Sequence, residues 1–92
     1  MIHITISNLK ERVFEGDVES TTLPGEVGEL TVLKNHVPLI TTMKKGVISV
    51  LMAEGERYEG DAPLDNARGK RKYFESKGGI FEFTNNEATI LL

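Results

Sequence analysis

Strict alternation of apolar and polar residues near the start of the chain restricts the fold more than any other feature of the sequence. Residues 2–7 read IHITIS, in which every second residue is isoleucine and the residues between them are polar. A period of two places the isoleucines on one face of an extended strand, whereas a helix would spread them around its axis. The pattern therefore predicts a half-buried strand over residues 2–7, with His3 on the solvent side.

Turn-forming residues divide the remaining sequence into short segments of similar character. Turns or loops are expected at residues 8–11, 24–29 and 34–39, around Gly46, and at Asn85-Asn86, because glycine and asparagine tolerate the positive φ angles of tight turns. Further strands are expected over residues 12–23, 30–33, 40–46, 47–53, 55–61, 72–76, 78–83 and 87–92. A bend or bulge is expected near Gly16, since a glycine inside a strand often marks one.

These features favour an all-β chain. No amphipathic segment of helical period exceeds two turns, and short strands separated by turns every eight to twelve residues are typical of a sandwich or barrel. We expect a flattened β-sandwich or barrel of about ten short strands, forming one domain over residues 1–92 without a C-terminal helical domain. With 39% apolar residues, a chain of 92 residues can fill a single modest core.

Composition excludes several classes of protein. The chain has no cysteine, which rules out disulfides and thiolate metal sites. No apolar run approaches the roughly 20 residues that a membrane-spanning helix needs. The opening MIHITISNLK has neither a basic start nor a long apolar stretch, so we expect no export signal.

The sequence offers little catalytic chemistry. His3 and His36 are the only imidazoles, and neither stands at a recognisable spacing from the three or four donors that a metal site requires. The glycines are not followed by the GK[ST] of a phosphate-binding loop, and no nucleophile elbow is present. Acids such as Glu26 and Glu29 are typical of solvated loops. We expect no catalytic residue, no metal, no cofactor and no enzymatic activity.

A basic cluster raises an alternative function. Residues 67–73 read ARGKRKY, with four basic side chains within Arg68–Lys72 and an aromatic residue after them. Such a cluster is compatible with a stand-alone β-module that binds nucleic acid or another polyanion. Against it, acids flank the cluster and the net charge is −3, whereas nucleic-acid binding depends on neutralising phosphates. A solvated hairpin tip is the favoured interpretation. A barrel that binds a small molecule is a further alternative.

Five short motifs together resemble a known family. They are Phe14-Glu15-Gly16, Gly28-Glu29-Leu30, His36–Ile40, Lys45–Ile48 and Gly78–Phe83. Each motif is weak alone, but their order and spacing are similar to those in the N-terminal β-sandwich domain of the ε subunit of F-type ATP synthases, whose mitochondrial equivalent is called δ. The resemblance spans nearly the whole chain.

The sequence departs from that family in three places. Asn35 stands where glycine is usual, and asparagine is the next-best residue for a left-handed backbone, so we expect the loop to be kept. The segment Tyr58–Phe74 is longer and more charged than expected. Its LDNARG, residues 64–69, is similar to a nucleotide motif of the family's C-terminal helical hairpin, but it precedes the closing strands and has Gly69 in place of alanine, so we expect no ATP site. The chain ends at Leu92, where that hairpin would begin, which implies no inhibition of ATP hydrolysis through it.

The resemblance implies a non-catalytic central-stalk subunit that links the γ subunit to the membrane c-ring and supports coupling of proton or sodium transport to ATP synthesis. It implies a peripheral location on the cytoplasmic face of the bacterial plasma membrane. Glu29, expected at the tip of the turn, and Glu26 are assigned to the c-ring side. His36, as a hydrogen-bonding contact, and Thr41 are assigned to the γ side. Three aliphatic residues are expected to pack into the core rather than contact the partner: Val37, Leu39 and Ile40.

Overall fold

The computed structural model describes residues 1–52 and 71–92, which form eight strands and no helix. The strands are β1 Ile2–Ser7, β2 Arg12–Gly25, β3 Gly28–Leu33, β4 Leu39–Met43, β5 Gly46–Met52, β6 Arg71–Ser76, β7 Gly79–Thr84 and β8 Glu87–Leu91. The prediction of an all-β fold is confirmed. The strand expected over residues 55–61 and the LDNARG segment lie outside the described residues.

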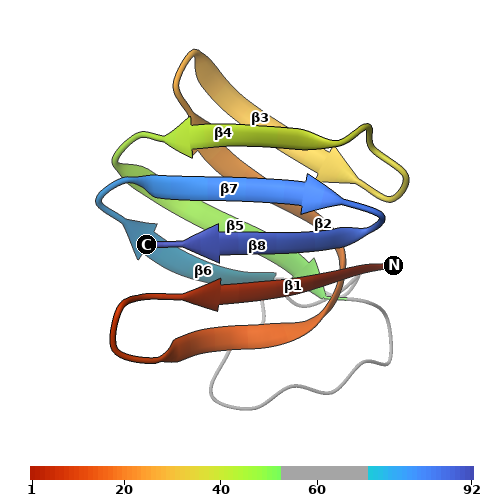
Figure 1. Cartoon of the computed structure of the whole chain (residues 1–92), viewed down its shortest axis with the longest axis horizontal. Coiled ribbons are helices and arrows are strands. Elements are labelled where there is room, and N and C mark those ends of the chain that lie inside the picture. Colours follow the sequence, from red (N-terminus) through yellow and green to blue (C-terminus); the bar gives the residue numbers. More distant parts are fainter. Residues whose placement is uncertain (53–70) are drawn as a thin grey trace.

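The strands form two layers that share the long strand β2 (Figure 1). One layer contains β4, β7, β8, β1 and the first half of β2, and the other contains β3, the second half of β2, β5 and β6. Strand β1 pairs with β8 in parallel and with β2 in antiparallel orientation, so the sheet is mixed. The motif IHITIS therefore lies inside a layer rather than at an edge.

Strand β2 changes partners without a break in the chain. Val18 is the last residue paired with β1, opposite Ile2, and it also pairs with Met52 of β5. The register shift lies between Val18 and Ser20, where the strand passes to the second layer. The sequence predicts a bend or bulge near Gly16: register shifts lie on both sides of it, between Arg12 and Phe14 and between Val18 and Ser20, whereas Gly16 itself pairs regularly with Ile4. The absence of a side chain at Gly16 leaves room for the Phe14 ring, which an added Cβ would approach to 3.3 Å.

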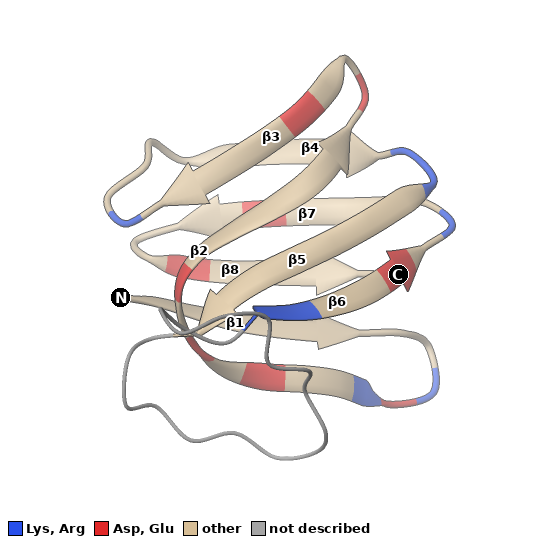
Figure 2. Cartoon of the chain, turned by 180° about the vertical axis from the view of Figure 1, so that it is seen from behind, with Lys and Arg blue, Asp and Glu red and all other residues tan. Residues whose placement is uncertain are grey.

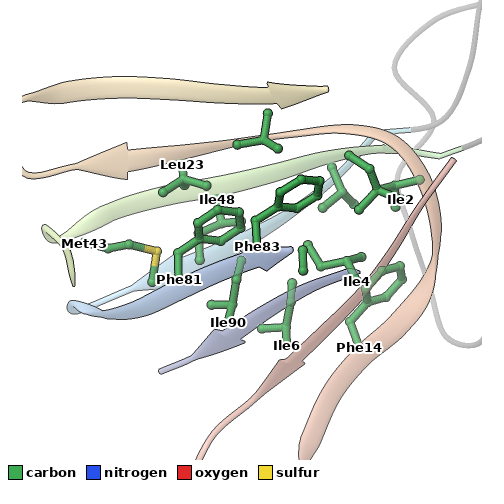
Figure 3. Close-up of a cluster of buried hydrophobic side chains, with 14 of the residues drawn as sticks. Ile2, Ile4, Ile6, Phe14, Leu23, Met43, Ile48, Phe81, Phe83 and Ile90 are labelled. Carbon is green, nitrogen blue, oxygen red and sulfur yellow. The ribbon is translucent and has the colours of Figure 1, made fainter. Parts of the chain in front are cut away.

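The core forms where the inner faces of the two layers meet. The three isoleucines of β1 are fully buried, which confirms the prediction drawn from their alternation. Phe81 and Phe83 of β7 lie beside them, and Leu23 and Ile48 approach from the other layer (Figure 3). Such close packing resists deformation, so the connections at the two ends of the sandwich are attached to a rigid core.

Asparagines form the positive-φ positions that the sequence predicted. The hairpin between β7 and β8 turns through Asn85 and Asn86, with φ angles of 50° and 60°. Asn35 has a φ of 67°, so it takes the left-handed conformation expected of a residue standing in place of glycine. Both predictions are confirmed.

Candidate docking surfaces at the two ends of the sandwich

One end of the molecule, here called the turn end, is formed by the β2–β3, β4–β5 and β6–β7 connections. Its exposed residues are Glu26, Val27, Lys44, Lys45 and Lys77. Figure 2 shows acidic segments on β3 and in the turn before it, and basic segments in the connections after β4 and β6. An open groove of about 680 Å³ crosses this end between Lys45, Val47 and Lys77. The turn end therefore offers mixed charges around a shallow apolar floor.

The two acids predicted to act at this end differ in their surroundings. Strand β2 extends to Gly25 and β3 starts at Gly28, so the tip is formed by Glu26 and Val27. The expectation that Glu29 lies at the tip is wrong, because the sheet ladder continues past it and pairs it with Pro24. Glu26 accepts a hydrogen bond from the Thr42 hydroxyl at 3.0 Å, which ties the turn to β4. Glu29 is exposed beside Lys44 and Lys45, which line the same shallow depression.

The opposite end carries the β3–β4 connection, here called the His36 loop and defined as residues 34–38. The backbone N–H of His36 donates to the Leu33 carbonyl at 3.1 Å. The His36 ring meets Phe83 edge to face, with centroids 6.0 Å apart. Its Nδ1 lies 2.7 Å from the Val37 carbonyl, which can only accept, so Nδ1 is the donor. The ring is therefore anchored on the core through Phe83.

Two aliphatic residues near His36 are exposed, contrary to expectation. Val37 and Ile40 are 68% and 70% exposed, so the prediction that they pack into the core is wrong for both. The cause is strand parity: Leu39 faces the core and is partly buried, which turns Ile40 outward, while Val37 precedes the strand. These two side chains add apolar surface beside His36. Thr41 is half-buried on the Leu39 side of β4, and its hydroxyl donates to the Thr42 carbonyl at 3.0 Å.

A pair of asparagines connects the His36 loop to the β7–β8 hairpin. Asn35 and Asn86 hydrogen-bond to each other although they are 51 residues apart in the sequence. Sequence reasoning assigned each residue to a turn but missed the link, because no local pattern reports which loops meet in space.

His3 forms a second cluster that the sequence did not reveal. Its Nε2 lies 2.7 Å from a Glu15 carboxylate oxygen, and its Nδ1 lies 3.0 Å from Asp17. Arg12 contacts the other oxygen of Glu15, and Glu87 of β8 is level with His3 in the parallel ladder. Both ring nitrogens can donate only when the imidazole is protonated. The hydrogen bonds to Asp17 and to Glu15 accordingly raise the pKa of His3 above 6.5.

This cluster makes the stability of the fold depend on pH. A raised pKa means that His3 contributes its full stabilisation below about pH 6.5, and the contribution is lost as the pH rises through the pKa of the folded state. As the pH rises from below 6.5 to above the pKa of folded His3, we expect the thermal midpoint to fall by on the order of 1–3 °C. The effect is small because His3, Glu15 and Asp17 are partly exposed. In His3→Gln this decline should be absent, and in His36→Gln it should remain. An unchanged decline in His3→Gln, measured by circular dichroism, would rule out the assignment.

The described part of the chain shows no group of three or more His, Asp or Glu side chains arranged to hold a metal ion. Nor does any helix in that part have the length and apolar character needed to cross a membrane. Of the basic cluster, Arg68–Lys70 lie outside the described residues. Lys72, on β6, has its ammonium about 6.0 Å from the Phe14 ring and 5.8 Å from the Phe74 ring, so it packs on aromatic side chains.

Comparison with known sequences identifies relatives of the chain. The family described as ATP synthase, Delta/Epsilon chain, beta-sandwich domain, matches residues 1–92. The ATP synthase epsilon chain of Delftia acidovorans is 32% identical over 90 residues, which cover 98% of this chain and 55% of that one. The epsilon chain of Verminephrobacter eiseniae is 43% identical over 54 residues, covering 59% and 39%. Where nearly the whole of this chain is matched, it therefore spans only about half the length of the curated relative.

Comparison with solved structures shows the same fold. A chain of the Euglena gracilis mitochondrial ATP synthase, in a complex of OSCP, F1 and c-ring, aligns with a TM-score of 0.74 and 20% identity, covering 98% of this chain and 49% of that chain. A chain of the Tetrahymena thermophila mitochondrial ATP synthase central stalk and c-ring gives 0.65 and 15%, covering 98% and 61%. At these identities the likeness concerns the fold alone.

Proposed function

The chain belongs to the ATP synthase delta/epsilon family, as a homologue of the β-sandwich domain of this non-catalytic subunit, and we propose from this membership that it acts in the central stalk of an F-type ATP synthase. It links the γ subunit to the c-ring and supports coupling of proton or sodium transport to ATP synthesis, at the cytoplasmic face of a bacterial plasma membrane. The match of the family over residues 1–92 carries the proposal. The solved relatives that share the fold come from assemblies containing a c-ring.

The arrangement of the two candidate surfaces supports a linking role. Strand β3 runs from Gly28, next to the turn end, to Leu33, next to the His36 loop. The molecule measures 31 × 28 × 22 Å, so two partners at its opposite ends do not compete for the same surface. A stable protein interface buries roughly 800 Å² on each side, and a close-packed core between two such interfaces passes torque from one to the other as a rigid body.

Charge at the turn end suits the polar loops of a ring subunit. Glu29 is exposed, whereas Glu26 is engaged by Thr42, so Glu29 is the better placed of the two to pair with a basic side chain or accept backbone hydrogen bonds. The γ side is assigned to His36 and Thr41, and the exposed Val37 and Ile40 add apolar surface near His36. Thr41 lies on the opposite face of β4 from Ile40 and donates to its own strand, so it does not share a surface with Ile40. An apolar patch around one hydrogen-bonding group is a common composition for the centre of an interface.

Glu29→Lys should weaken retention of the c-ring. The exchange places a third positive charge beside Lys44 and Lys45 and removes the acceptor, so we expect roughly tenfold weaker association of the ring with a complex of this chain and γ. Coupled ATP synthesis in reconstituted vesicles should fall in parallel, while affinity for γ alone should stay unchanged.

Glu19→Lys is the matched control, because Glu19 is also exposed but lies within β2, where that strand passes between the two layers. It should leave both ring retention and synthesis near wild type. Wild-type ring retention and synthesis in Glu29→Lys would remove Glu29 from the contact. If the unmodified chain fails to bind γ and instead binds RNA in a salt-sensitive manner, the stalk function itself is wrong and the polyanion alternative stands.

A further inference from the structure

The Asn35–Asn86 pair joins two connections through reciprocal amide contacts. The backbone N–H of Asn35 donates to the Asn86 side-chain oxygen at 2.6 Å. The Asn86 side-chain NH₂ donates in return to the Asn35 side-chain oxygen at 3.1 Å. Together these bonds form a clamp between the His36 loop and the β7–β8 hairpin.

Asn86 is itself anchored in the sandwich. Its backbone carbonyl accepts a hydrogen bond from the His3 N–H at 3.0 Å, so its position is set by the start of β1 as well as by its own hairpin. Asn35 and Asn86 both hold left-handed backbone angles, which restricts where their side chains can reach. The clamp therefore attaches the His36 loop to the rigid part of the molecule.

The consequence for His36 is a fixed tautomer and orientation. Nδ1 carries the proton that it donates to the Val37 carbonyl, so in the neutral ring Nε2 is a hydrogen-bond acceptor. Nε2 has no hydrogen-bond partner within residues 1–52 and 71–92. The ring directly follows the clamped Asn35 in the chain and packs against Phe83 in a T-shaped contact.

We infer that Asn86, which lies outside the His36 loop, is a positioning residue for docking, and that it presents His36 Nε2 to an N–H or O–H donor on the γ subunit. Val37, next to His36 in the chain, and Ile40, at the start of β4, are exposed, so the fitting partner surface combines apolar area with one donor for Nε2. The identity of the partner rests on the proposed function, whereas the clamp and the tautomer do not. A loop held in its bound conformation avoids the entropy cost of ordering on association.

Asn86→Gly tests the clamp, because glycine keeps the positive φ angle and removes the amide. We expect roughly tenfold weaker binding of the full chain to purified γ subunit in calorimetry, about the effect of losing one or two hydrogen bonds that pre-order a contact. The Asn35 amide should also lose protection from hydrogen exchange. Asn85→Gly is the matched control: it changes the neighbouring asparagine of the same turn, while both clamp hydrogen bonds run through Asn86, and it should leave both measurements unchanged.

A double-mutant cycle separates positioning from general destabilisation. In a His36→Ala background, Asn86→Gly should weaken γ binding by less than about twofold, since its effect acts through His36. Nitrogen chemical shifts of His36 in the free protein at alkaline pH should report the Nδ1–H tautomer, with a mixture of tautomers in Asn86→Gly. Full additivity in the cycle, or an Nε2–H tautomer in the wild-type chain, overturns the inference. Failure of the wild-type chain to bind γ overturns the proposed function instead, and the exchange and tautomer measurements still decide the clamp.

Discussion

Gly79→Ala is expected to lower the free energy of unfolding by about 3 kcal/mol or more, a large part of the roughly 5–15 kcal/mol that stabilises a domain of this size. A Cβ at this position would overlap the backbone carbonyl oxygen of Leu91 and would lie 3.2 Å from the end of the Met43 side chain. The φ angle of 149° is also one that residues with a side chain rarely adopt. Relief would require moving β7 away from β8, and urea unfolding measures the cost.

Gly78→Ala is the control for this effect of crowding. Gly78 also has a positive φ angle, of 123°, but the nearest atom to an added Cβ is the Met43 carbonyl oxygen at 3.5 Å, an ordinary contact. Only the backbone strain remains, and it costs about 1–2 kcal/mol. If both variants lost the same free energy of unfolding, the close approach of β8 would not be the reason why position 79 requires glycine.

Features that depend on neighbouring residues in the chain could be predicted from the sequence. Alternation alone identified the buried face of β1, because side-chain direction in a strand follows directly from position. The Asn85-Asn86 turn was predicted for a similar reason, since a two-residue hairpin needs positive φ angles and asparagine tolerates them. The family resemblance rested on the same local motifs, and it is the part of the functional prediction that the comparisons support.

Features that depend on register or on contacts between distant segments could not be predicted. The expected turn was two residues too long on each side, since the pairing of Pro24 with Glu29 is a property of the β2–β3 ladder. The exposure of Ile40 follows from which face of β4 meets the core. The His3 cluster and the clamp require knowing that β1 lies beside β2 and that the His36 loop lies beside the last hairpin. These contacts set the geometry of the candidate site.

Phe81→Ala should destabilise the fold by about 3–5 kcal/mol, the usual cost of removing a fully buried aromatic ring. Phe81 has no exposed surface. Its strand β7 is paired on both sides, and Phe81 lies opposite Thr41 of β4 and Ile90 of β8. The neighbouring strands cannot close on the cavity without breaking their own pairing, so the lost contacts are not recovered.

Ile80→Ala provides the comparison, because Ile80 is the preceding residue on β7, faces solvent and is 47% exposed. Its loss should cost less than about 1 kcal/mol. The two variants also separate stability from docking: at temperatures where both remain folded, both should bind γ like the wild type, and only Phe81→Ala should lose binding as it unfolds on warming. A similar free energy of unfolding for the two variants would mean that the rigid core proposed to link the two ends is not centred on this ring.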